Sequence, residues 1–201
     1  ASENQKKAIF ADSLATLYAE AGRFDSAGVF AEEAASFFKT EESWFKAGDS
    51  YYQGYTFALN ANKQGNLGEK SRELFQKVLD INPNNLAAKT KMAMTYLSSA
   101  PMKGVGMLRE VIEADPKNEL ALFNLGMLSI QSGQNEKAVS WLSRLVEVNP
   151  AHTQGTLLLG LAYMNTGQKK KAKEQFEKVK DMDKDPAVQA AVDSYLKDLN
   201  K

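Results

Sequence analysis

Residues 119–152 have the sequence ELALFNLGMLSIQSGQNEKAVSWLSRLVEVNPAH, and residues 153–186 continue with TQGTLLLGLAYMNTGQKKKAKEQFEKVKDMDKDP. The two stretches align without a gap and place three pairs of small residues 34 positions apart: Gly126 and Gly160, Gly133 and Gly167, Ala138 and Ala172. Apolar residues in both stretches recur three and four positions apart, which is the period of an amphipathic helix. A repeat of about 34 residues with helical periodicity predicts stacked helical hairpins.

The prolines extend this repeat over most of the chain. Four of the five follow Asn or Asp, at positions 83, 116, 150 and 186, so their spacings are 33, 34 and 36 residues. Proline cannot continue a helix interior, and each of these dipeptides therefore predicts the passage from one repeat to the next. We expect five repeats in a single domain spanning 1–201, with a final helix over 187–200 that caps the last repeat. The repeats are expected at 8–40, 41–85, 86–118, 119–152 and 153–186.

These repeats resemble the tetratricopeptide repeat (TPR), whose first helix has the pattern W-x₂-L-G-x₂-Y and whose second half has the pattern A-x₃-F-x₇-P. The second repeat matches the first pattern, with Ala replacing Leu, through Trp44, Ala47, Gly48 and Tyr51. It matches the second pattern through Ser71, Phe75 and Pro83. The resemblance covers residues 8–186 and implies an all-α fold, a right-handed superhelical solenoid of five hairpins that acts in protein binding and has no catalytic site.

Small residues in this pattern have a physical role that does not depend on the family. Two helices of a hairpin approach closely only where side chains are small, as at Gly126 and Gly160, with large residues such as Leu142 and Phe176 filling the space beside them. Three further glycines stand where the first helix of a repeat must end and reverse, and glycine tolerates the positive φ found at such ends. These are Gly22, Gly133 and Gly167.

The second repeat carries 11 more residues between its two motifs than its neighbours do. Eleven residues make about three helical turns, so we expect the insertion to lengthen the first helix, with a turn at Gly65-Asn66. The extension is expected to project beyond the regular stack. Its aromatic residues Tyr55 and Phe57 serve either as an accessory recognition surface or in packing against the neighbouring repeats. The third repeat is one residue short, and Pro101 is expected in its turn.

Composition excludes several classes of function. The chain has 201 residues with 25 Lys and Arg against 25 Asp and Glu, and a nucleic-acid-binding protein usually has a basic excess. The absence of cysteine excludes disulfides, thiol catalysis and thiolate metal sites. No apolar run reaches the roughly 18 residues of a membrane span. Because the sequence begins at Ala1, we expect a processed protein or a fragment, from which an upstream signal or membrane anchor could have been removed; cytoplasm and periplasm both remain open.

The sequence also predicts no enzyme, no cofactor and no metal site. His152 is the only histidine, which excludes a Ser-His-Asp triad and a multi-histidine metal site within one chain. Sister repeats have Asn85 and Asn118 at its position, so we expect His152 to cap a helix. Residues 181–185 imitate the start of a calcium loop, but the glycine and glutamate that such a loop requires are missing further on.

One apolar surface remains without an assigned role. In proteins of this family the first helices of the repeats line the concave side. On that side, the residues at positions i, i+4 and i+7 of the first helices in the third, fourth and fifth repeats form an apolar band. The apolar band consists of Met94, Leu97, Phe123, Met127, Ile130, Leu157, Leu161 and Met164. An exposed band of this kind usually marks an interaction site, and methionine adapts to the shape of a ligand. The alternative is that neighbouring first helices bury these residues against one another.

The resemblance offers one further recognition mode, the clamp that binds the terminal carboxylate of chaperone tails. Only Asn124 matches the residues of that clamp, so the clamp is disfavoured. The sequence therefore predicts a protein-interaction scaffold, with Asn124 and the apolar band in a groove that binds a peptide or a partner helix. The alternative function is self-assembly into a homo-oligomer through the same groove or through the extended second repeat.

Overall fold

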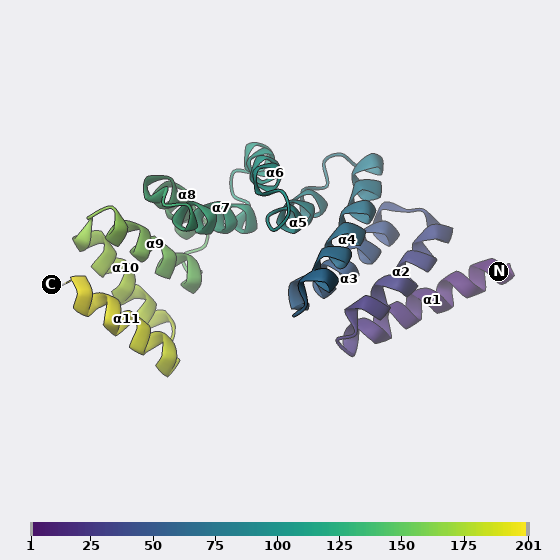
Figure 1. The fold of residues 1–201 in the computed structure, drawn as a ribbon, viewed down its shortest axis with the longest axis horizontal. Helices are drawn as coiled ribbons and strands as arrows, with labels where there is room; N and C mark the ends of the chain where they lie inside the picture. The colour runs from purple at the N-terminus through teal and green to yellow at the C-terminus, as the bar shows by residue number, and fades with distance from the viewer. Residues whose placement is uncertain (1, 200–201) are drawn as a thin grey trace. The chain divides into compact units, whose positions relative to one another are not determined.

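The computed structural model describes residues 2–199, and these residues form α-helices and turns with no strand among them (Figure 1). The expected all-α class is confirmed. The chain divides into two compact units, Ala1–Leu108 and Arg109–Lys201, which we call the N-terminal and C-terminal units. The boundary between them lies inside α6 (Pro101–Ala114).

In the N-terminal unit, helices that follow one another in the chain pack together: α1 on α2, α2 on α3, α3 on α4 and α4 on α5. The helices are α1 (Glu3–Glu20), α2 (Phe24–Phe38), α3 (Glu41–Phe57), α4 (Ala61–Ile81) and α5 (Leu86–Tyr96). The core of this unit joins a row of alanines on α2 to buried aromatic rings of α3 and α4, among them Trp44 and Phe75. Small side chains on α2 leave room for these rings.

The C-terminal unit repeats the same arrangement, with α7 on α8, α8 on α9, α9 on α10 and α10 on α11. Its helices are α7 (Glu119–Gln131), α8 (Asn135–Val148), α9 (Thr153–Asn165), α10 (Lys169–Met182) and α11 (Pro186–Leu199). Helix α11 lies where the capping helix over 187–200 was expected, and residue 200 lies outside the described residues. It buries Val192 and Leu199 in a cluster with Phe176 of α10.

The glycines close the hairpins as predicted. A Cβ atom built on Gly126 would lie 2.5 Å from Cγ of Leu142, and one on Gly160 would lie 2.6 Å from Cε1 of Phe176. Real Cβ atoms do not approach other carbons this closely, so only glycine fits without a shift. The turn glycines have the expected positive φ angles, 70° at Gly22, 72° at Gly133 and 74° at Gly167.

Helix N-termini also follow the sequence prediction. The Nδ1 atom of His152 accepts a hydrogen bond of 3.0 Å from the backbone N–H of Gly155, at the start of α9. Asn85 and Asn118 cap α5 and α7 through their side-chain oxygens in the same way. His152 is thus a capping residue, which satisfies one of the free N–H groups of the first turn.

The predicted position of the insertion in the second repeat is wrong. The hairpin turn lies at residues 58–60, and Gly65 and Asn66 are inside α4. Compared with α7 and α8, which have 13 and 14 residues, α3 has 17 and α4 has 21, so four and seven extra residues account for all 11. The insertion lengthens both helices because Asn60 caps α4 by accepting a hydrogen bond from the N–H of Lys63.

Two further features of the second and third repeats differ from the prediction. Pro101 is the first residue of α6 rather than a residue of the preceding turn, because the missing N–H of proline costs nothing at the first helical position. Tyr55 lies half-buried against α5, with its hydroxyl 3.4 Å from the backbone oxygen of Met94 and 3.2 Å from Ser98 Oγ. Phe57 stacks on Phe24 of α2 and remains 68% exposed. The structure therefore gives Tyr55 a packing role.

Candidate protein-binding surface

The structure places the apolar band on the first helices of three hairpins. Met94 and Leu97 lie on or just after α5 in the N-terminal unit, and the other six residues lie on α7 and α9 in the C-terminal unit. All eight are half-buried. Asn124 is buried, with 3% of its surface exposed, and its amide donates to the backbone oxygen of Leu120 at 2.7 Å. Its side chain is thus used within α7.

In the C-terminal unit, part of the apolar band already packs against neighbouring helices. The ring of Phe123 stacks on His152 with 5.2 Å between the ring centroids. Leu157, Leu161 and Met164 pack against the buried cluster formed by α10 and α11. Each of these side chains therefore uses one side for packing and keeps a partly exposed side. Packing against other helices, which was the alternative to an exposed band, therefore covers these residues only in part.

In the N-terminal unit, the first helices are joined by two ion pairs that the sequence analysis did not identify. Lys46 of α3 reaches back to α1, where its Nζ atom lies 2.6 Å from Oδ1 of Asp12 and 3.0 Å from the hydroxyl of Thr16. Lys91 of α5 pairs in the same way with Asp49 of α3. The sequence provided only a weak indication of these pairs. Lys46 and Lys91 each stand two residues before a small residue, Gly48 and Ala93, at which a hairpin closes. This spacing predicts the helix face on which each lysine lies, but not the carboxylate with which it pairs.

Aromatic rings surround the second of these pairs. The ammonium group of Lys91 lies 5.5 Å from the ring centroid of Phe45 and 5.4 Å from that of Tyr52, within the range of a cation–π interaction. Burial raises the pKa of the Tyr52 hydroxyl, and the neighbouring Tyr55 and the charge of Asp49 raise it further. The Tyr52 hydroxyl therefore remains a neutral hydrogen-bonding group at physiological pH.

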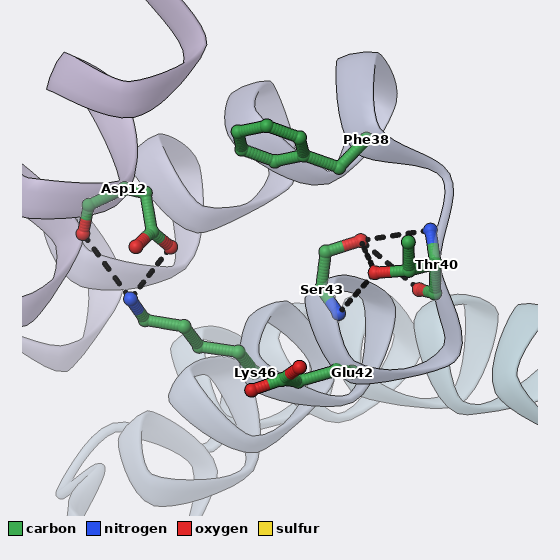
Figure 2. A pocket seen from close by; sticks show the side chains of 6 residues that line it. All are labelled: Asp12, Phe38, Thr40, Glu42, Ser43 and Lys46. Carbon is green, nitrogen blue, oxygen red and sulfur yellow. Dashed lines mark hydrogen bonds and ion pairs between the residues drawn. The ribbon is translucent and has the colours of Figure 1, made fainter.

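Two hollows flank the N-terminus of α3. The first has a volume of about 330 Å³ and is shown in Figure 2; it is lined by Asp12, Phe38, Thr40, Glu42, Ser43 and Lys46. The second has a volume of about 500 Å³ and is lined by Thr40, Glu41, Glu42, Phe45, Asn85 and Ala87. Such volumes lie in the range of ligand pockets, about 300–1,000 Å³.

The walls of these hollows are held rigidly. Thr40 and Ser43 form a reciprocal capping box, in which each residue donates its backbone N–H to the other's hydroxyl, at 3.1 and 3.2 Å (Figure 2). Glu41 accepts hydrogen bonds from the side-chain amides of Asn82 and Asn85, at 2.9 and 2.8 Å, which fixes the turn before α5. Glu42, in contrast, is exposed and makes no ion pair with another described residue, so it adds a negative charge shared by both hollows.

A second network lies between α2, α3 and α4. Tyr51 is buried, and its hydroxyl donates to Glu32 at 3.1 Å, while Lys70 of α4 lies 3.0 Å from the same carboxylate. Burial raises the pKa of Tyr51, and the charge of Glu32 and the hydrogen bond to it act in the same direction. The hydrogen bond to Glu32 likewise raises the pKa of Lys70. This network ties the first two hairpins together.

Residues 2–199 contain no cluster of three or more His, Cys, Asp or Glu side chains that could hold a metal ion. In the same range, no helix is both long enough and apolar enough to cross a membrane. The first-helix surfaces thus combine apolar side chains, fixed charges and open hollows.

Family models agree with this architecture. Two models, both described as the tetratricopeptide repeat, match residues 105–158 and 157–186. The matched residues 105–186 therefore contain tetratricopeptide repeats. No curated protein matches the sequence significantly.

Solved structures of MamA and YrrB share the fold. MamA from Desulfovibrio magneticus RS-1, from residue 41 to its end, is 21% identical; the match covers 90% of this chain and 97% of that one, with a TM-score of 0.70. A second crystal structure of MamA is 17% identical, covers 86% and 96%, and has a TM-score of 0.68. YrrB, described as a TPR protein with an unusual peptide-binding site, is 19% identical, covers 96% and 94%, and has a TM-score of 0.64. At these identities the likeness concerns the fold alone.

Proposed function

We propose that the chain is a non-catalytic scaffold that binds a peptide or a helix of a partner protein on the first-helix surfaces of its repeats. The observation that carries the proposal is the apolar band. The hairpins close through Gly126 and Gly160, whereas the band residues stay half-exposed on the same helices. Apolar area that the fold does not need is typical of an interaction site. The peptide-binding site described for YrrB supports the same class of function in this fold.

The test combines selection of peptide ligands with two band substitutions. A displayed peptide library is selected on the parent chain, and the recovered peptides are then measured on Met127→Glu with Leu161→Glu. Both residues are half-buried and outside the hairpin contacts. A carboxylate that must be desolvated on binding costs several kcal/mol unless it is paired, so affinity should fall by more than 100-fold.

The control is Gln134→Glu, an exposed residue at the turn between α7 and α8, which should bind the peptides like the parent. Circular dichroism and thermal melts are recorded for every variant. Parental affinity in a folded double variant would show that the band is not the site. A double variant that does not fold would assign Met127 and Leu161 to the core, and the proposal would then fail at these positions.

In the N-terminal unit, we propose that the hollows beside Glu42 receive a basic side chain of the ligand. Asp12 is neutralised by Lys46, and Glu41 is held by the amides of Asn82 and Asn85, so Glu42 is the exposed carboxylate left to attract a cation. Glu42→Gln should weaken peptides that contain lysine or arginine and leave neutral peptides unchanged. Equal affinity for both kinds of peptide would exclude this role and leave the band proposal intact.

A further inference from the structure

The turn between α3 and α4 exposes two large apolar side chains. Leu59 is 105% exposed, so its whole side chain lies in water, and Phe57 is 68% exposed. We call these two residues the apolar tip. Tight turns normally hold Gly, Asn, Asp or Ser. The corresponding turns of the first, fourth and fifth repeats contain only small, polar or charged residues and a central glycine, at 21–23, 132–134 and 166–168.

The insertion in the second repeat moves the apolar tip outward. Gly48 and Gly126 stand equally far from the N-caps of α3 and α7, so the four extra residues of α3 lie at its end beside the turn. Phe75 and Leu142 stand equally far from the ends of α4 and α8, so the seven extra residues of α4 lie at its start. Four and seven residues make about one and two helical turns. The apolar tip therefore stands further out along its hairpin than the turn between α7 and α8 does.

Local contacts hold the apolar tip in this exposed position. The ring of Phe57 stacks on Phe24 of α2, with 5.6 Å between the ring centroids. Asn60, directly after Leu59, caps α4 through the backbone N–H of Lys63 at 3.0 Å. Both sides of the turn are thus fixed, and Leu59 extends between them without covering apolar surface of its own hairpin. Apolar surface that stays in water is unfavourable, so the fold gains nothing from a leucine at this position.

The neighbouring hairpin adds a third exposed apolar side chain. The hydroxyl of Tyr55, two residues before Phe57, lies 3.2 Å from Oγ of Ser98 in the turn between α5 and α6. Just after that turn, Met102 of α6 is 84% exposed. Leu59, Met102 and Phe57 are the three most exposed large apolar side chains among residues 2–199. The strongest apolar exposure of the described chain is therefore at two adjoining hairpins of the N-terminal unit.

The sequence around these side chains contains no negative charge. No Asp or Glu occurs in residues 50–68 or in residues 81–109. Asp25 of α2, which approaches the start of α4, is paired with Lys63 at 2.9 Å. Lys103, next to Met102, is an exposed cation. Exposed Phe and Leu beside Lys or Arg are typical of segments that lie on anionic membranes, because apolar burial and attraction to the lipid charge then act together.

The small size of this surface distinguishes a membrane from a protein as the partner. A specific protein interface buries about 800 Å² on each partner, and a few side chains on two turns do not form a continuous surface of that size. A bilayer takes up single side chains between its headgroups, and the strength of binding increases with the apolar area that enters. Leu59, which is fully exposed at the end of a lengthened hairpin, has the geometry that such insertion requires.

We propose that the apolar tip is a membrane-contact site, at which Phe57 and Leu59 insert into the interface of a bilayer that contains anionic phospholipids. Met102 and Lys103 lie on the adjoining hairpin and strengthen the contact, the first through apolar area and the second through its charge. The site is separate from the apolar band on α7 and α9, and the proposal does not depend on peptide binding there.

The first experiment places a fluorescent reporter at the apolar tip. Leu59→Trp is mixed with vesicles of phosphatidylcholine and phosphatidylserine, and the spectrum of the parent, which contains Trp44 and Trp141, is subtracted. The added tryptophan should shift its emission to shorter wavelengths and be quenched by lipids with brominated acyl chains. Ile81→Trp is the matched control. Ile81 is 51% exposed and is the last residue of α4, at the end opposite the apolar tip, so its emission should not change.

The second experiment measures binding by co-sedimentation with the same vesicles. Leu59→Glu, alone and together with Phe57→Glu, should weaken binding by about tenfold or more, because apolar area is lost and a carboxylate meets anionic lipid. Ile81→Glu should bind like the parent. Lys103→Glu should weaken binding to vesicles with phosphatidylserine but not to vesicles of phosphatidylcholine alone. Leu59 makes no packing contact that folding requires, and thermal melts check that every variant is folded.

Three results would overturn the proposal. The first is a parent chain that binds neither kind of vesicle. The second is binding that leaves the emission of Leu59→Trp unchanged, because the contact would then lie elsewhere on the chain. The third is a parent that light scattering shows to be an oligomer and that Leu59→Glu makes monomeric without any vesicle binding, which would assign the apolar tip to a second copy. The peptide test above uses variants on α7 and α9, so its outcome and this one can be told apart.

Discussion

Replacing Gly126 by alanine should destabilise the protein, whereas replacing Gly65 by alanine should stabilise it, although both glycines lie inside helices. Alanine is favoured over glycine in a helix by about 0.5–1 kcal/mol, because glycine loses more backbone freedom on folding. At Gly65 nothing lies within 4 Å of the added Cβ. The alanine variant at Gly65 should therefore gain about 0.5–1 kcal/mol.

At Gly126 the added methyl group meets Leu142. The Cβ would lie 2.5 Å from Cγ and 2.6 Å from Cδ2 of that residue, whereas carbon atoms pack best at about 3.5–4.0 Å. Leu142 is fully buried. Overpacking of this kind costs about 1–3 kcal/mol, of which the helix preference of alanine offsets up to about 1. We expect a net loss of about 1–2 kcal/mol for alanine and a larger loss for leucine.

The assay is thermal and urea unfolding followed by circular dichroism. For a chain of this length, 1 kcal/mol shifts Tm by about 2–4 °C, so Gly126→Ala should lower Tm by about 2–8 °C and Gly65→Ala should raise it slightly. Combining Gly126→Ala with Leu142→Ala should cost less than the sum of the single changes, because the methyl group then occupies the space of the removed side chain. An increase in Tm for Gly126→Ala would refute the close hairpin contact.

Three further predictions use the same unfolding assay. His152→Ala should lower stability by about 0.5–2 kcal/mol through loss of the α9 cap, and His152→Asn should retain it; equal losses would exclude capping. Because the folded pKa of Tyr51 is raised above the unfolded value of about 10, its contribution is present below pH 10 and is lost as the pH rises further, so Tyr51→Phe should show a smaller alkaline loss than the parent. A similar loss in both would remove Tyr51 as the cause. Tyr55→Phe should cost about 0.5–1.5 kcal/mol without changing peptide affinity; an affinity loss would return the insertion to a recognition role.

Much of the fold could be predicted because its rules act over short distances in the chain. The repeat of small residues fixed where each hairpin closes, as the contacts of Gly126 and Gly160 show. Positive φ at Gly133 and capping by His152 depend on a few neighbouring residues, and both predictions are confirmed. Helical periodicity likewise decides which residues share a face, and the residues of the apolar band lie on or just after α5, α7 and α9.

Prediction of the second hairpin failed because several breaks in a long helical segment satisfy the same local rules. Glycine is tolerated inside a helix, so Gly65 did not require a turn. The cap at Asn60 and the packing of Leu67 and Tyr55 decided the turn at 58–60 instead. The sequence shows that the second repeat has 11 extra residues. How many of them belong to α3 and how many to α4 is decided by the packing of the hairpin.

By itself, the sequence determined the repeat, the helices and the faces that their side chains share. Tertiary structure alone decided which of those faces a neighbour covers. Asp12 and Lys46 are 34 residues apart, and their pairing exists only because two hairpins stack. Phe10 and Ala88 occupy equivalent positions, yet one is exposed and the other buried, because burial depends on whether another helix lies against the position and not on the residue that occupies it.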